Sequence, residues 1–172
     1  MSNADHPKVL VVFFSRSGTT RRLAEHIARA THADVEEIRE PRSRRGILGW
    51  LRSGYEGTYR RSAKILPLRR NPQDYDLVYV GSPTWNGSLA SPVRGFLEHH
   101  ADVLGSVALF ATCAGRGATD VIAQMTEVLK HAPLATLAML ERDVSHSPSV
   151  QVGELVEATL EAWEGAAGGA RS

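Results

Sequence analysis

A hydroxyl-rich stretch near the N-terminus has the chemistry of an anion site. It lies between an apolar run and a segment with helical periodicity, so its backbone N–H groups would gather at a helix N-terminus. Hydrogen bonds to a charged group contribute about 1.5–3 kcal/mol each, so about four or five can hold a phosphate without a lysine. The alternative is an ordinary helix cap, which Ser and Thr form in any protein. The stretch consists of Ser15, Arg16, Ser17, Gly18, Thr19 and Thr20.

A second polar stretch holds a tryptophan and an Asn-Gly pair. An exposed tryptophan in a loop is costly unless it covers something, and Trp85 either covers a ligand or packs against its own loop. Asn-Gly is a frequent turn sequence. The stretch consists of Ser82, Pro83, Thr84, Trp85, Asn86 and Gly87.

A third stretch combines small residues with two glycines, which would let the backbone approach a planar ring closely. Cys113 is the only cysteine, which excludes a disulfide within the chain and any CxxC pattern, and it fits a cytoplasmic location. No general base is evident for its thiol, so we expect an inert small residue. The stretch consists of Thr112, Cys113, Ala114, Gly115, Arg116 and Gly117.

Each stretch follows a segment that has the pattern of a buried strand. Apolar, β-branched runs predict strands over Val9–Phe14, Val35–Arg39, Leu77–Gly81, Val107–Thr112 and, more weakly, Leu134–Leu140. Helical periodicity predicts helices over Thr19–Thr31, Pro92–His100, Gly117–His131 and Val150–Trp163. A short helix is also predicted within Gly46–Tyr59, where four glycines weaken it.

This alternation predicts a doubly wound α/β fold, a three-layer sandwich with helices on both faces of a five-stranded parallel sheet of order 2-1-3-4-5. Ligands of such sheets lie beyond the carboxyl ends of the strands, which is where the three stretches are expected. We expect one domain over residues 1–164 and a mobile Gly/Ala-rich tail over residues 165–172.

The motifs resemble those of the flavodoxin family. The run 15–20 is similar to the family's phosphate loop T/S-x-T-G-x-T, with Ser17 in place of the usual Thr. Residues 81–97 resemble the run G-S-P-x-W-x-G-x-x-x-x-P-V-x-x-F-L of bacterial members, and residues 112–117 resemble their third flavin loop. The resemblance covers most of the chain and implies FMN as a non-covalent cofactor.

The resemblance also implies roles for individual residues. Ser15, Ser17, Gly18, Thr19 and Thr20 would hold the phosphate, with help from Arg16, while residues 82–87 and 112–117 would flank the isoalloxazine. Trp85 would stack on the ring or touch its edge. The Asn86–Gly87 peptide would be the one near flavin N5 that reorients on reduction.

Three neighbouring classes of protein are excluded by residues that are missing. A phospho-receiver domain needs acidic residues after the first strand and an aspartate after the third, where this chain has Ser15 and Ser82. A Walker nucleotide hydrolase needs a lysine after the first strand, and residues 15–20 contain none. A dinucleotide fingerprint needs a third glycine and a distant acid, which Gly115 and Gly117 lack.

Three functions remain open. The first is an FMN-dependent oxidoreductase that passes electrons from a nicotinamide nucleotide to a quinone-like or other small acceptor. The second is a single-electron carrier that serves redox partner proteins. Carrier flavodoxins are typically acidic and this chain has a formal net charge of +1, which favours the enzyme. The third is a flavin-free binding module that uses the basic segment 39–70.

The basic segment Arg39–Arg70 has several readings besides that module. It could dock an acidic redox partner, receive nucleotide phosphates, or form a homodimer contact through an apolar stripe in residues 47–55. Interleaved aromatics resemble a nucleic-acid surface, but arginine-rich solvated loops are common and we expect no nucleic acid. The histidines show no ligand spacing, so no metal is expected, and no apolar run is long enough for a membrane span.

Overall fold

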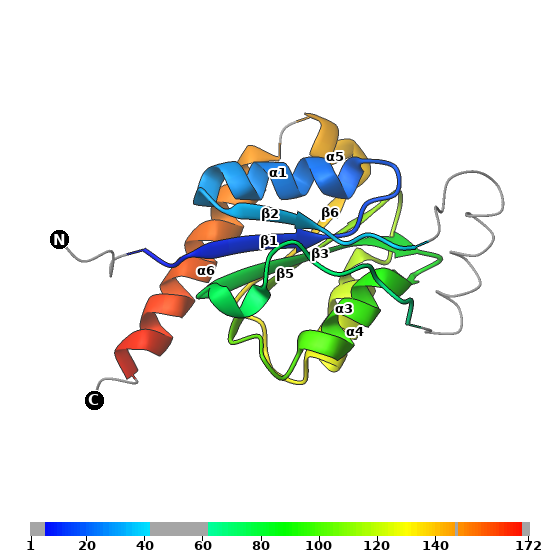
Figure 1. Cartoon of the computed structure of the whole chain (residues 1–172). Helices are drawn as coiled ribbons and strands as arrows, with labels where there is room; N and C mark the ends of the chain where they lie inside the picture. The colour runs from blue at the N-terminus through cyan, green and yellow to red at the C-terminus, as the bar shows by residue number, and fades with distance from the viewer. Residues whose placement is uncertain (1–5, 42–61, 147, 170–172) are drawn as a thin grey trace.

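The computed structural model describes residues 6–41, 62–146 and 148–169, with side chains described through residue 166. A parallel sheet lies at its centre, with the order β2-β1-β3-β5-β6 that the sequence predicts (Figure 1). The fold class is therefore confirmed. The strands are β1 (Val9–Phe13), β2 (Asp34–Glu37), β3 (Leu77–Trp85), β5 (Ser106–Cys113) and β6 (Thr136–Leu140).

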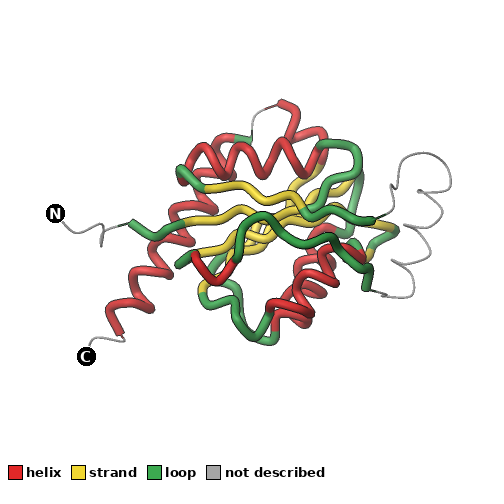
Figure 2. Tube along the Cα trace, in the orientation of Figure 1, coloured by secondary structure: helices red, strands yellow, loops and turns green. Residues whose placement is uncertain are grey.

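Helices cover both faces of the sheet (Figures 1 and 2). One layer consists of α1 (Thr19–Thr31), α5 (Glu141–His146) and α6 (Ser149–Gly169). The other layer consists of α3 (Ser91–His100) and α4 (Ala118–Leu129). The strands point to the right in Figure 1, so the loops after β1, β3 and β5 lie at that edge.

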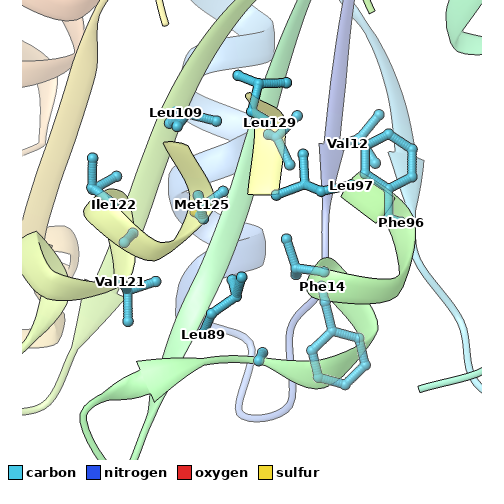
Figure 3. Packing of buried hydrophobic residues seen from close by; sticks show 14 of the residues in the cluster. Val12, Phe14, Leu89, Phe96, Leu97, Leu109, Val121, Ile122, Met125 and Leu129 are labelled. Atoms are coloured by element: carbon cyan, nitrogen blue, oxygen red, sulfur yellow. The ribbon is translucent and has the colours of Figure 1, made fainter. Parts of the chain in front are cut away.

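Two apolar cores result from the alternation of side chains along the strands. In β1, Val9, Val11 and Phe13 pack under α1 and α6, whereas Leu10 and Val12 face α3 and α4. Figure 3 shows the second core, which includes Phe14 and Leu89. Because every residue of β1 is buried, the strand reads as a continuous apolar run rather than an alternating one.

Several elements differ from the prediction. Strand β3 continues four residues past Gly81 and turns into the antiparallel β4 (Ser88–Leu89). The short helices η1 (Pro72–Asp74) and α5 were not predicted, because neither is long enough to show helical periodicity. Helix α6 continues through Gly169, past the predicted helix end at Trp163. The helix predicted within 46–59 lies outside the described residues.

Within the part of the chain that the structure describes, no helix is both long and apolar enough to cross a bilayer.

Candidate ligand site at the carboxyl edge of the sheet

The first loop places free backbone donors at the start of α1. Its N-cap is Gly18, which adopts a left-handed conformation with φ 95° and has no side chain to cap the helix. The Ser15 hydroxyl accepts from the Gly18 amide at 3.1 Å, which holds the loop in its turn. The first turn contains no acidic residue. The N–H groups of that turn have no partner within the helix, so the loop suits an anion.

The side chains of this loop divide into an exposed and a buried set. Arg16 and Ser17 are exposed, whereas Thr19 and Thr20 are buried at the base of the loop. The Thr20 hydroxyl hydrogen-bonds that of Thr112 over 2.8 Å, although 92 positions separate the two residues. This contact ties the first loop to the end of β5, as a shared site requires.

The second stretch is mostly strand rather than loop, which corrects the prediction. Residues 82–85 extend β3, and only Asn86 and Gly87 form the turn to β4. Both turn residues have positive φ, 48° and 73°, as a two-residue hairpin turn requires. The Asn-Gly pair was recognised as a turn, but the hairpin was missed because β4 has only two residues.

Trp85 is not an exposed loop residue. Its side chain is 5% exposed and lies in the core that faces α3 and α4. Its ring meets Phe14 edge to face, with 5.5 Å between the centroids. The sequence left open whether the indole covers a ligand or packs against its own loop, and the structure instead packs it on Phe14 in the core. An indole that stacks on a ring ligand would have to leave this packing.

Two hydroxyls on this part of β3 behave differently. The Ser82 hydroxyl is fully buried, donates to the Pro83 carbonyl at 2.8 Å and accepts from the Ala90 amide at 3.3 Å. It therefore supports the hairpin from inside. The Thr84 hydroxyl oxygen is buried without a hydrogen-bond partner. An unpaired buried hydroxyl costs about 1–3 kcal/mol, so this atom is chemically suited to a ligand that pairs with it.

The third loop lies directly against the second. Thr112 and Cys113 are the buried last residues of β5, so the loop proper begins at Ala114 and is exposed through Arg116. Gly117 ends it as the N-cap of α4, with φ 99°. A Cβ on Gly117 would lie 3.4 Å from both the Gly87 Cα and the Thr84 Cγ2. The predicted small residues therefore allow the two loops to touch.

Sequence reasoning missed Gln124, a buried residue of α4 that reaches the hairpin. Its Nε2 donates to the Gly87 carbonyl at 3.3 Å, and its Oε1 accepts from the Leu89 amide at 3.1 Å. The available signal was a polar residue on a helix face otherwise formed by Val121, Met125 and Val128. A glutamine on an apolar face needs internal partners.

Positive charge flanks this edge. Arg16 in the first loop and Arg116 in the third are both exposed. Among the described residues, no group of three or more His, Cys, Asp or Glu side chains gathers in a way that could hold a metal ion. The chemistry of the edge is thus that of hydroxyl, amide and guanidinium donors.

The amino edge of the sheet carries a separate charged cluster. The Tyr75 hydroxyl donates to Asp34 at 2.8 Å, and Arg70 Nη2 lies 3.2 Å from the other carboxylate oxygen. The Tyr75 hydrogen bond is the main cause that lowers the pKa of Asp34, and Arg70 lowers it further. Burial is the main cause that raises the pKa of Tyr75. This cluster lies at the opposite ends of the strands from the three loops.

The sheet order and the three converging loops define a doubly wound α/β protein with a candidate ligand site at the carboxyl edge. A family model described as flavodoxin matches residues 8–154, which is most of the chain. The chain therefore belongs to the flavodoxin family. No curated protein sequence matches it.

Solved structures share this fold. A flavoprotein from Lactobacillus acidophilus NCFM, determined in complex with FMN, is 22% identical, with a TM-score of 0.66 over 81% of this chain and 97% of that chain. The two-electron reduced flavodoxin of Megasphaera elsdenii is 21% identical, with a TM-score of 0.56 over 90% of this chain and 99% of that chain. At these identities the likeness supports the fold.

Proposed function

We propose that this protein binds FMN non-covalently at the carboxyl edge and transfers electrons through it from a nicotinamide nucleotide to a quinone-like or other small acceptor. The observation that carries the proposal is the convergence of an uncapped, hydroxyl-rich helix N-terminus with a glycine-lined second and third loop. Membership of the flavodoxin family and the FMN complex of the Lactobacillus flavoprotein support the choice of cofactor.

The phosphate end of the proposed site is the first loop. The α1 amides and the hydroxyls of Ser15, Ser17, Thr19 and Thr20 supply donors, and no acidic side chain in the first turn repels a dianion. The positive end of the helix dipole adds to this attraction. Arg16 is placed in the same loop and exposed, so it can neutralise part of the charge.

The ring end of the proposed site is formed by the 86–87 turn and the third loop. The exposed backbone of Asn86, Gly87, Ala114 and Gly115 offers hydrogen-bonding groups with little side-chain bulk. The Thr84 side chain, whose methyl group lies near Gly117, carries the buried unpaired hydroxyl. Trp85 supports the turn from the core and is not assigned a stacking role in this arrangement.

Bound FMN would supply the one- and two-electron chemistry, while the protein supplies binding, orientation and electrostatics. The exposed Arg16 and Arg116 favour the enzyme over the carrier, because they can attract the phosphates of a nicotinamide nucleotide. The near-neutral formal charge of +1 supports the same choice.

The test is an anaerobic titration of the FMN-loaded protein with NADH and NADPH, followed by flavin absorbance. An oxidoreductase bleaches within seconds. Arg116→Ala should raise the KM for the nucleotide several-fold, while Arg142→Ala, an exposed arginine of α5, should leave it unchanged. Equal KM values for the two variants would show that Arg116 does not contribute to nucleotide binding.

The second candidate is the single-electron carrier, which the flavodoxin family match itself favours. FMN-loaded protein that ignores both nucleotides but accepts electrons one at a time from a chemical reductant would support the carrier. Protein that does not bind FMN would overturn both candidates and favour a flavin-free binding module.

A further inference from the structure

Gln124 makes a bidentate contact with the β3–β4 hairpin from a different helix. Its side chain is 8% exposed, and both ends of its amide are engaged. Nε2 donates to the Gly87 carbonyl at 3.3 Å, and Oε1 accepts from the Leu89 amide at 3.1 Å and from Arg94 Nη2 at 3.5 Å. A single side chain therefore holds the turn residue Gly87 and the following strand β4 to α4.

The hairpin geometry explains why the Leu89 amide needs an outside partner. Trp85 and Ser88 close the two-residue turn, and Thr84 pairs with Leu89 next along the ladder. Hydrogen-bonded and non-hydrogen-bonded pairs alternate in an antiparallel ladder, so the Leu89 amide turns away from β3. A buried N–H without a partner costs about 1–3 kcal/mol, and Gln124 Oε1 removes that cost.

The same helix connects the turn to the third loop. Helix α4 begins at its N-cap Gly117, whose backbone lies against Gly87, and carries Gln124 two turns further on. The Gln124 amide thus fixes the turn to the same helix whose N-terminal glycine faces Gly87. A shift of the turn relative to this helix would break the hydrogen bond to the Gly87 carbonyl.

We propose that Gln124 is a positioning residue for the ring end of the flavin site: it fixes the 86–87 turn against the third loop without touching the cofactor. This inference rests on the proposed FMN function. It assigns Gln124 to the ring end alone, because its contacts lie on the hairpin and the first loop is held separately by the Thr20–Thr112 hydrogen bond.

Riboflavin, which lacks the phosphate, separates a ring-end effect from a phosphate-end effect. Gln124→Met keeps the length of the side chain and removes both hydrogen bonds. We expect it to raise the Kd of FMN and of riboflavin by the same factor, about tenfold. Gln151→Met is the matched control, because Gln151 is an exposed residue of α6 far from the hairpin contacts.

Gln124→Glu tests which half of the amide matters. The carboxylate keeps an acceptor for the Leu89 amide but replaces the donor to the Gly87 carbonyl with a second oxygen. Amide hydrogen exchange in the FMN-free protein should therefore find Leu89 protected in Gln124→Glu and at least about tenfold faster in Gln124→Met. Both flavins should bind more weakly to each variant.

The outcomes separate the inference from the function on which it rests. Wild-type protein that binds neither flavin overturns the proposed function and this inference with it. Wild-type protein that binds both, with unchanged Kd values in Gln124→Met and Gln124→Glu, overturns the role of Gln124 alone. A loss of FMN affinity with unchanged riboflavin affinity would also overturn it, because that pattern belongs to the phosphate end.

Discussion

The two ends of the proposed site are built in different ways. The phosphate end is one continuous loop, residues 15–20, in which the donors follow one another along the chain. The ring end combines the β3–β4 hairpin, the loop after β5 and Gln124 from the middle of α4. A local loop can be read from a motif, whereas an end assembled from three distant segments depends on the whole fold.

The two helix N-caps show the same contrast. Gly18 and Gly117 have nearly the same backbone, with φ 95° and 99° and ψ −7° and −2°. A Cβ on Gly18 would meet nothing within 4 Å, whereas a Cβ on Gly117 would meet Gly87 and Thr84 at 3.4 Å. Gly18 is thus required only by the backbone conformation of its own loop. Gly117 is also required because a neighbouring segment lies close to it.

The largest effect is expected at the phosphate end. Thr20→Val keeps the shape of the side chain but removes a hydroxyl assigned to the phosphate and leaves Thr112 without its 2.8 Å partner. A hydrogen bond to a charged group contributes about 1.5–3 kcal/mol, so FMN affinity should fall about ten- to hundredfold. Fluorescence titration should find riboflavin affinity nearly unchanged.

Thr31→Val, at the other end of α1, is the matched control. Its hydroxyl donates to the Ile27 carbonyl at 2.8 Å, away from the loop, so the affinities for both flavins should stay the same. If Thr20→Val lowers the affinities for FMN and riboflavin equally, the phosphate end and the ring end of the site do not act separately.

A smaller effect is expected from alanine at the two glycine caps. A left-handed conformation costs a residue with a Cβ about 1–2 kcal/mol, so Gly18→Ala and Gly117→Ala should each lower the free energy of unfolding by about that amount. Gly117→Ala should lower it more, because it also crowds Gly87 and Thr84. Urea denaturation measures both.

Flavin binding sharpens the comparison of the glycines. Gly117→Ala should weaken FMN and riboflavin alike, and Gly18→Ala should weaken FMN alone. Gly105→Ala is the control, because Gly105 precedes β5 at the amino edge of the sheet, its φ is not positive, and a Cβ there meets nothing within 4 Å. If Gly18→Ala and Gly117→Ala have the same binding profile, the two ends are not independent.

The smallest effect is expected at the amino edge, which serves as a reference outside the site. Because the pKa of Asp34 is lowered in the folded protein, its contribution to stability is present above the unfolded pKa of about 3.9 and is lost as the pH falls through the folded value. Tyr75→Phe removes the main cause of this shift. It should cost less than about 1 kcal/mol at pH 7, since the cluster is exposed.

Urea denaturation at several pH values checks the sign. The difference between wild type and Tyr75→Phe should shrink as the pH falls below about 4, and it should disappear below the lowered folded pKa of Asp34, where the carboxyl is protonated in both. The raised pKa of Tyr75 implies a contribution that is present below about pH 10 and lost as the pH rises through the folded value. A gap that stays constant from pH 7 to pH 3 would contradict the role of the Asp34 carboxylate. FMN affinity should not change.

The sequence predicted what depends on local pattern. The apolar run at 9–14, the periodicity of 19–31 and the alternation of strands and helices led to the correct sheet order and to a helix with the observed bounds. It did not predict the hairpin, because a two-residue strand has no periodicity. It also left the position of Trp85 open, since packing against Phe14 depends on the end of another strand.

The direct test of the central claim is a fluorescence titration of the wild-type protein with FMN and, in parallel, with riboflavin. The account predicts that both flavins bind and that FMN binds at least about tenfold more tightly, because only FMN reaches the donors of the first loop. Equal affinities for the two flavins would show that the first loop does not bind the phosphate. Absence of FMN binding would contradict the proposed site as a whole.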